Sequence, residues 1–300
     1  MFSRLQIFGF RALWSPYFLL FIISLAVLYF LITGPLRKKF AKEDVERPTT
    51  KQQISFYLGR ALLYAVKGSP IDLLSHISFL AHMIQMAMYY LLFPILIIRG
   101  IPKWVWMKVF NTRVLKPILK LLTKPVVAVF LFNFLFSLYH MPAILDFSKS
   151  NNIAHSSIST IVLFGAFCMW WPLLAPIKEH QIKKPLIKVF YIFANGMLIT
   201  PACGLIIFAP ESLYDTYSNM EMWANALSLC VPLDILNSLT ASGLNGPEFF
   251  TNISLLHDQQ AAGIVMKVLQ EVIYGTVLAK VFFSWYGSES RGIDPIPNQS

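Results

Sequence analysis

Long apolar stretches separated by short polar connections dominate the chain. Apolar runs with few or no charges occupy residues 14–33, 73–98, 125–145, 157–177, 186–209 and 258–285, and a shorter run at 54–66 contains Arg60. Runs of about 20 apolar residues are long enough to cross the roughly 30 Å hydrocarbon layer as helices. The pattern therefore predicts an all-α polytopic bundle of about seven transmembrane helices, forming one integral membrane domain over 1–300.

The composition points to the same class of protein. Hydrophobic residues make up 56% of the chain and charged residues only 13%, whereas soluble domains carry roughly 25% charged residues. The net charge of +10 comes from basic residues in several short connections, not from one stripe, so nucleic-acid binding is not expected. The partner that this composition predicts is the lipid bilayer.

The basic residues also predict the orientation of the bundle. Segments 34–53, 99–124 and 178–188 hold six, seven and four Lys or Arg residues, whereas segment 210–257 holds none and carries five acidic residues. Connections rich in Lys and Arg stay in the cytoplasm. We therefore expect the amino terminus outside and the carboxyl terminus inside.

Two of the connections have a character of their own. Segment 101–124 mixes tryptophan and phenylalanine with lysine and arginine, which is typical of a helix lying on the cytoplasmic membrane surface; a solvated basic loop is the alternative. Segment 210–257 is apolar in its middle but interrupted by polar residues and proline. It is expected to lie outside the membrane as an interfacial or re-entrant element.

Five of the six histidines fall in the predicted outer half of the protein. On the third predicted helix, His82 and Met86 are four residues apart and so share one face, with Met83 and His76 nearby. At 1.5 Å of rise per residue, His82 is expected roughly 13 Å below the outer end of that helix. The other outer candidates are His140, His155, His257 and Asp258.

Imidazole and thioether groups together suit a soft ion such as Cu(I), whereas Mg²⁺ and Ca²⁺ sites need oxygen ligands. The sequence thus predicts a copper site, with packing and interhelical hydrogen bonds as the alternative for each residue. Cys168, Cys203 and Cys230 are far apart in sequence and are interpreted as reduced, buried side chains.

Lys267 and Glu271 stand four residues apart in the last predicted helix. A mutual ion pair is the simpler interpretation, and a proton or ion path is the alternative. The chain contains no nucleophile, metalloprotease or phosphate-loop motif that would indicate an enzyme.

Four sequence blocks resemble a known family. They are 78–85 (SFLAHMIQ), 139–143 (YHMPA), 170–174 (WWPLL) and 258–266 (DQQAAGIVM), and the pair Leu213-Tyr214 also matches. In this order, over about 68–286, they resemble the signature blocks of the multi-span CtaG family. This chain has Met86 where many relatives have a second histidine, the match around His155 is loose, and segment 219–256 is longer than usual.

The resemblance implies a non-enzymatic assembly factor of the bacterial plasma membrane, needed for a copper-containing haem-a cytochrome c oxidase, with oxidase subunits as its partners. Such oxidases hold one copper within the membrane and one above it on the outer side. Together with the residues, this predicts an outward-open site that binds Cu(I) and delivers it to an oxidase subunit. A copper transporter continuing inward past Arg60, Lys267 and Glu271, and a scaffold that holds no metal, are the alternatives. The expected ligands are His82, Met86 and His140, with Asp258, His257, His155 and His76 guiding the ion or completing the site.

Overall fold

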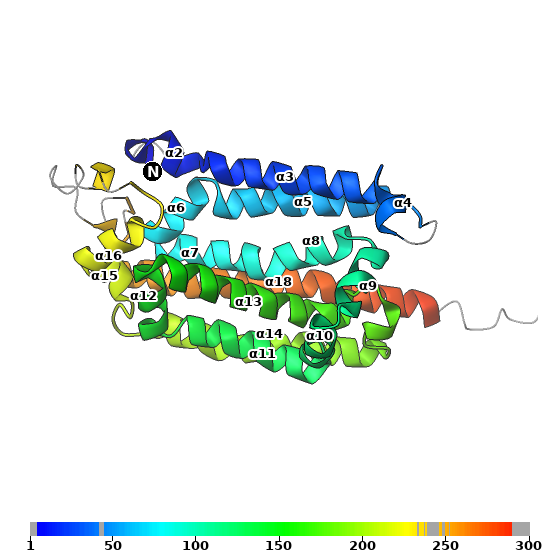
Figure 1. The fold of residues 1–300 in the computed structure, drawn as a ribbon. Helices are drawn as coiled ribbons and strands as arrows, with labels where there is room; N and C mark the ends of the chain where they lie inside the picture. The colour runs from blue at the N-terminus through cyan, green and yellow to red at the C-terminus, as the bar shows by residue number, and fades with distance from the viewer. Residues whose placement is uncertain are drawn as a thin grey trace, which may run out of the picture.

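A computed structural model describes residues 5–41, 45–232, 234–236, 238, 246–247, 250–251 and 253–289, and every regular element in them is helical. The long helices lie side by side along one axis (Figure 1). They are α3 (Pro16–Thr33), α5 (Thr50–Lys67), α11 (Pro125–Tyr139), α13 (Asn152–Leu174), α14 (Pro185–Ile207), α18 (Leu255–Glu289) and the continuous run of α7 (Phe79–Met86), the π-helical turn η2 (Ala87–Leu92) and α8 (Phe93–Gly100).

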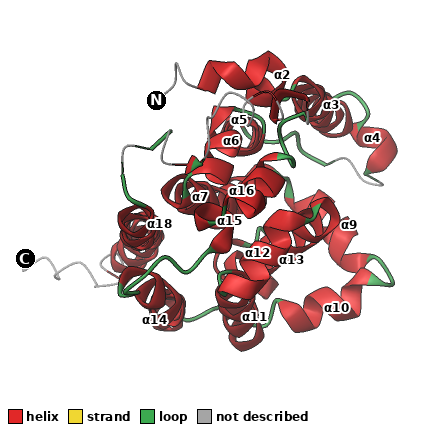
Figure 2. Cartoon of the chain, turned by 90° about the vertical axis from the view of Figure 1, so that its left-hand side faces the viewer, coloured by secondary structure: helices red, strands yellow, loops and turns green. Residues whose placement is uncertain are grey.

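The run from α7 to α8 is the central helix of the bundle. Of its most apolar 18 residues 67% are buried, against 17% for the amino-terminal run that includes α3. Figure 2 shows α7 near the middle, with α3 and α5 on one side and α11 and α14 on the other. The π-helical turn ends two residues before Pro94, which has no N–H to donate to a regular helix. The central helix therefore changes its hydrogen-bond pattern at mid-length.

Close backbone contacts hold helices against their neighbours. A side chain at Gly100 would meet the backbone nitrogen of Phe56 at 2.6 Å, and the Tyr29 hydroxyl donates to the Gly100 carbonyl at 3.0 Å. A side chain at Gly263 would meet Ile207 at 2.6 Å in the same way. Small residues allow such approaches between membrane helices. Glycine thus lets α5 approach the end of α8, and α18 approach α14.

Short helices cover the two ends of the bundle. One end carries α2 (Gly9–Trp14), α6 (Pro70–Ile77), α12 (Pro142–Ser150), α15 (Asp215–Ser218) and α16 (Met220–Leu227) (Figure 1). The other end carries α4 (Arg37–Phe40), α9 (Lys103–Asn111), α10 (Leu115–Leu122) and the 3-10 turn η3 (Lys178–His180). We call the first the histidine end, because His76, His82, His140, His155 and His257 lie toward it, and the second the basic end, because α4, α9, α10 and η3 are rich in lysine and arginine.

The structure corrects two of the predicted helices. The run predicted over 73–98 is broken at Ser78, which separates α6 from α7, and the run predicted over 125–145 ends at Tyr139, after which Pro142 opens α12. Proline is preferred in a first helical turn, so the pattern at 142 marks a new helix. The predicted helices at 157–177, 186–209 and 258–285 correspond to α13, α14 and α18 with shifted ends.

Five helical runs in the described residues are long and apolar enough to cross a membrane, or six if α10 and α11, which meet at an 85° bend, form one span. Helix α5, predicted as a span over 54–66, is not among them; it contains Lys51, Arg60 and Lys67. The fold is an all-α polytopic bundle. Seven crossings, the surface position of 101–124 and the orientation stay predictions.

The described part of 210–257 packs over the histidine end. After Leu213, α15 and α16 lie across α12 and α6, and Trp223 and Leu227 of α16 join a buried cluster with Leu73 and Ile77 of α6. Residues 233, 237, 239–245, 248–249 and 252 lie outside the described residues. The segment thus contributes a lid of short helices to this end.

Candidate metal site at the histidine end

Two buried imidazoles lie close together, His82 in α7 and His140 at the end of α11. The ring centroids of His82 and His140 lie 5.8 Å apart, and the ring of Phe79 stacks on His82 at 5.6 Å. Both histidines are buried, His82 completely. The break at Ser78 places His82 in the first turn of α7 instead of the expected 13 Å from the helix end.

The hydrogen bonds of these rings are incomplete. His140 Nδ1 lies 2.8 Å from the Phe136 carbonyl, which can only accept, so Nδ1 carries the proton and Nε2 presents a lone pair. Within the described residues His140 Nε2 has no hydrogen-bond partner, and neither does either nitrogen of His82. A buried polar group left unpaired costs about 1–3 kcal/mol. The pair therefore offers two nitrogen lone pairs to a cation, one from each neutral ring.

Thioether groups lie close to this pair along the chain. Met83 follows His82 directly, and Met86 comes one helical turn after it on the same face of α7. Both methionines are buried. Thioether sulfur atoms can pack against other side chains or can ligate a soft ion. Met86 therefore stays a candidate ligand.

His76 and His155 form a second group, apart from the first. Their ring centroids are 5.6 Å apart, and His76 belongs to α6, so the break at Ser78 removes it from the α7 stripe predicted with His82 and Met86. His155 Nδ1 lies 3.4 Å from the Ser148 hydroxyl. The second group therefore has its own partners on α6, α12 and α13.

The sequence did not indicate that Lys149 belongs to this group. Its ammonium nitrogen lies 3.4 Å from His76 Nδ1 and donates to the Ser75 carbonyl at 3.3 Å. The side chain is 1% exposed, and burial, with help from the positive charge of Lys67, lowers the pKa of Lys149 to about 7. A lysine in a connecting segment looks solvent-exposed in sequence, and only the packing of α12 against α13, α15 and α16 buries it beside α6.

Asp258 does not point at the histidines as a free ligand. Its carboxylate accepts hydrogen bonds from the Ser78 hydroxyl at 2.7 Å and from the backbone N–H groups of Phe79 and Leu80 at 2.7 and 3.2 Å. These donors open α7, and the first N–H groups of a helix have no partner within it. Asp258 thus acts as a cap supplied by α18, and it positions the helix that carries His82.

His257 differs from the other predicted site residues because it is exposed. Its Nδ1 lies 2.8 Å from the Ser254 hydroxyl, three residues earlier in the chain. That hydrogen bond occupies one ring nitrogen and turns it toward Ser254. The structure therefore gives His257 a local partner at the start of α18.

Residues from 213–217 close the site from the lid side. The Tyr214 hydroxyl donates to the His140 carbonyl at 2.8 Å, and its ring stacks on Phe79 at 4.4 Å. Asp146 of α12 fixes this segment by accepting from the Thr216 N–H at 3.0 Å and its hydroxyl at 2.7 Å. Tyr214 thus covers the histidine pair from this end.

Comparison with known proteins gives one match. The family model described as cytochrome c oxidase caa3 assembly factor (Caa3_CtaG) matches residues 27–288. The chain belongs to this family. Neither the curated proteins nor the solved structures give a match. The resemblance found in the sequence is confirmed, and with it an assembly role that involves components of cytochrome c oxidase.

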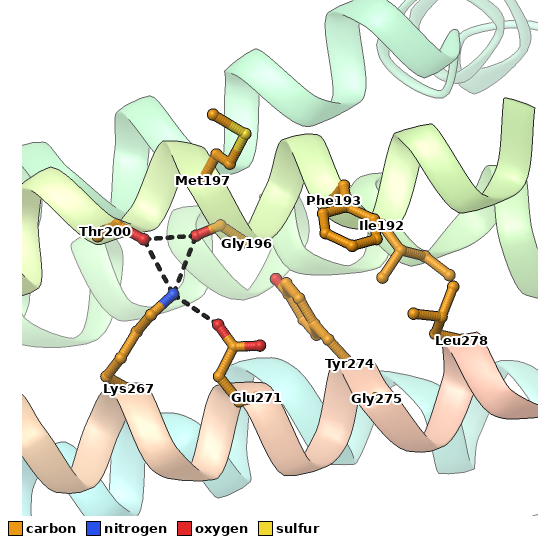
Figure 3. Close-up of a pocket in the computed structure, with 10 residues that line it drawn as sticks. All are labelled: Ile192, Phe193, Gly196, Met197, Thr200, Lys267, Glu271, Tyr274, Gly275 and Leu278. Carbon is orange, nitrogen blue, oxygen red and sulfur yellow. Dashed lines mark hydrogen bonds and ion pairs between the residues drawn. The ribbon is translucent and has the colours of Figure 1, made fainter.

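In this CtaG-family protein the predicted pair of Lys267 and Glu271 is present. The two side chains meet at 2.7 Å, and Lys267 also donates to the Thr200 hydroxyl at 2.9 Å and the Gly196 carbonyl at 3.3 Å. Figure 3 shows them in a cavity of about 210 Å³ between α14 and α18. The Glu271 side chain is 61% exposed, so the pair faces out of the bundle.

Arg60 is remote from this ion pair. It belongs to α5, which lies on the opposite side of the bundle from α14 (Figures 1 and 2). Its guanidinium sits over the rings of Phe56 and Phe93 at 5.0 and 5.6 Å. The structure therefore does not bring Arg60, Lys267 and Glu271 together into one inward path.

Replacing Asp258 tests its role as a cap. Asp258→Ala leaves the first N–H groups of α7 unpaired and is expected to lower the free energy of unfolding by about 1–2 kcal/mol. The measurement is the thermal unfolding midpoint of the purified protein in detergent, with the exposed Glu179→Ala as the matched acidic control. An unchanged midpoint in Asp258→Ala would contradict the capping role.

A double-mutant cycle tests the ion pair of α18. Lys267→Met leaves the carboxylate of Glu271 without its cation, and Glu271→Gln leaves the ammonium of Lys267 without its anion. The losses of the two single variants are therefore expected to sum to more than the loss in the double variant. The expected coupling energy is about 0.5–3 kcal/mol. Additive losses, with no coupling, would show that the two charges do not stabilise each other.

Proposed function

We propose that this CtaG-family protein carries Cu(I) between His82 and His140 and passes it to a subunit of cytochrome c oxidase during assembly. The observation that supports the proposal is the fully buried imidazole of His82, which has no hydrogen-bond partner among the described residues. A buried polar group without a partner is costly, and a bound cation would remove that cost.

The donor set favours copper among the biological cations. Two neutral imidazoles with thioether sulfur nearby match the preference of Cu(I), whereas hard ions require several oxygen ligands. Metal–nitrogen bonds are about 2 Å long, so rings whose centroids are 5.8 Å apart can share one ion after a small movement. The hydrogen bond from His140 Nδ1 to Phe136 keeps Nε2 free for this role.

The position of the pair suits delivery to a partner. His82 and His140 lie beneath the lid that Tyr214 closes, at the end opposite the basic connections. The distribution of Lys and Arg favours a histidine end outside the cytoplasm in a bacterial plasma membrane. Movement of the short helices α15 and α16 would open the ion to an oxidase subunit on that side.

Copper content tests the proposal directly. The protein is purified in detergent, loaded with Cu(I) under reductant, and analysed for copper per chain in wild type, His82→Leu, His140→Leu and Met86→Leu. Loss of one copper is expected in both histidine variants, with weaker binding in Met86→Leu because one soft ligand is lost. The matched control is His180→Ala, which removes a histidine from the basic end.

The same variants, expressed in cells, connect copper to assembly. Oxidase activity and copper content are expected to fall together in His82→Leu and His140→Leu membranes. Full copper binding in both variants would overturn the copper proposal, and intact oxidase in both would separate the site from assembly. Copper uptake into sealed vesicles would instead indicate transport.

The stability of the metal-free protein gives an independent prediction. His82→Leu replaces an unpaired buried imidazole with an apolar side chain, so we expect the free energy of unfolding to rise by about 1–3 kcal/mol. The check is the thermal midpoint in the presence of a copper chelator, compared with His180→Ala. A lower midpoint for His82→Leu would mean that the imidazole is paired in solution.

A further inference from the structure

Three potential ligands from two distant parts of the chain meet beside α6. Oxygen of Asp72, nitrogen of His76 and sulfur of Cys230 all lie within 4.8 Å of one another. Among the described residues, these three form the one group of at least three His, Cys, Asp or Glu side chains placed closely enough to share an ion. It differs from the His82 and His140 pair in composition, since it contains a thiol and a carboxylate.

The three side chains are held in place by the folding of their elements. Asp72 and His76 are four residues apart in α6 and so share a helical face. Cys230 sits in the turn that follows α16, where its N–H and that of Val231 both donate to the Leu227 carbonyl at 3.0 and 2.9 Å. Leu227 and Val231 pack in the buried cluster that also contains residues of α6. The thiol is therefore brought to α6 by the packing of the lid.

The Asp72 carboxylate is oriented toward the thiol. Its Oδ1 accepts from the Gln85 side chain at 2.7 Å and lies 3.4 Å from the Lys67 ammonium, whereas Oδ2 lies 3.7 Å from Cys230 Sγ. Two donors on one oxygen leave the other directed at the sulfur. Hydrogen bonds of this kind orient the ligating carboxylates of metal sites.

Positive charge surrounds the group. The Lys149 ammonium lies 3.4 Å from His76 Nδ1, and Lys67 pairs with Asp72. The His76 ring is also hydrogen-bonded to the backbone of Ala226. A cation bound here would displace these contacts and be repelled by the Lys67 ammonium and by the protonated form of Lys149, so its affinity is reduced compared with the same ligands alone.

We infer that Asp72, His76 and Cys230 form a second metal site, for a thiophilic cation such as Zn²⁺ or Cu(I), from which the ion exchanges readily. A thiolate, an imidazole and a carboxylate are the ligands of this class of ion. Binding forms the metal–sulfur bond and releases the thiol proton to water, with no change in oxidation state. The nearby lysines make the site suited to transfer more than to storage.

The inference does not rest on copper binding by His82 and His140, and the experiment separates the two. The full-length protein with both histidines replaced, His82→Leu and His140→Leu, is titrated in detergent under reductant with Zn²⁺ alone and with Cu(I) alone against a competing chelator. One metal equivalent is expected to remain, and adding Cys230→Ser or Asp72→Asn is expected to weaken it by at least about tenfold. Cys203→Ser is the matched cysteine control, since that thiol is buried in α14.

A gain of affinity provides a readout that misfolding cannot produce. Lys149→Met removes one repelling charge and is expected to tighten metal binding while leaving the three ligands in place. In parallel, bound metal is expected to slow maleimide labelling of Cys230. The proposal would be overturned if the Cys230→Ser and parent proteins bound both metals with equal affinity, or if Lys149→Met bound metal more weakly. If one ion is retained only in the Cu(I) titration or only in the Zn²⁺ titration, the result supports the proposal and identifies the preferred cation.

Discussion

The first turn of α7 begins inside the molecule, and this creates the constraint on which the histidine end depends. A helix that starts among buried residues needs acceptors for its first N–H groups, because water cannot supply them there. Ser78 and the carboxylate of Asp258, which is 180 positions farther along the chain, fulfil this requirement. The contact ties the last long helix to the central one, and it sets the position of His82 relative to α11.

Burial of polar groups in this protein follows two patterns. Asp146, Asp258 and Gln259 are buried with their oxygen atoms accepting backbone hydrogen bonds, so they are structural. His82 is buried and has no hydrogen-bond partner among the described residues. In a low-dielectric interior the first pattern stabilises the fold, whereas the second costs free energy. This contrast is what supports the proposal of an ion at His82, although other buried side chains in the described residues, such as Tyr139 and Trp170, also lack a partner.

Two ligand groups of different chemistry lie at the same end of the bundle. The pair of His82 and His140 presents neutral nitrogen with thioether sulfur nearby, and the face of α6 presents thiol, imidazole and carboxylate. The Ser78 break separates them, since it ends α6 and starts α7. With the two sites proposed above, an assembly factor for cytochrome c oxidase would have the means to receive and to hold an ion.

The order of apolar runs and the blocks at 78–85 and 139–143 were enough to predict an all-α membrane bundle, its family and the pairing of Lys267 with Glu271, because hydropathy and i to i+4 spacing are local properties. The proximity of His82 and His140 was expected from the predicted topology and the family's blocks. The tertiary structure alone decided that Asp258 caps α7, that Lys149 is buried and that Cys230, interpreted from sequence as a reduced, buried side chain, meets Asp72 and His76. These contacts join residues up to 180 positions apart, and no local pattern encodes which distant side chain will satisfy a buried donor or stand beside a thiol.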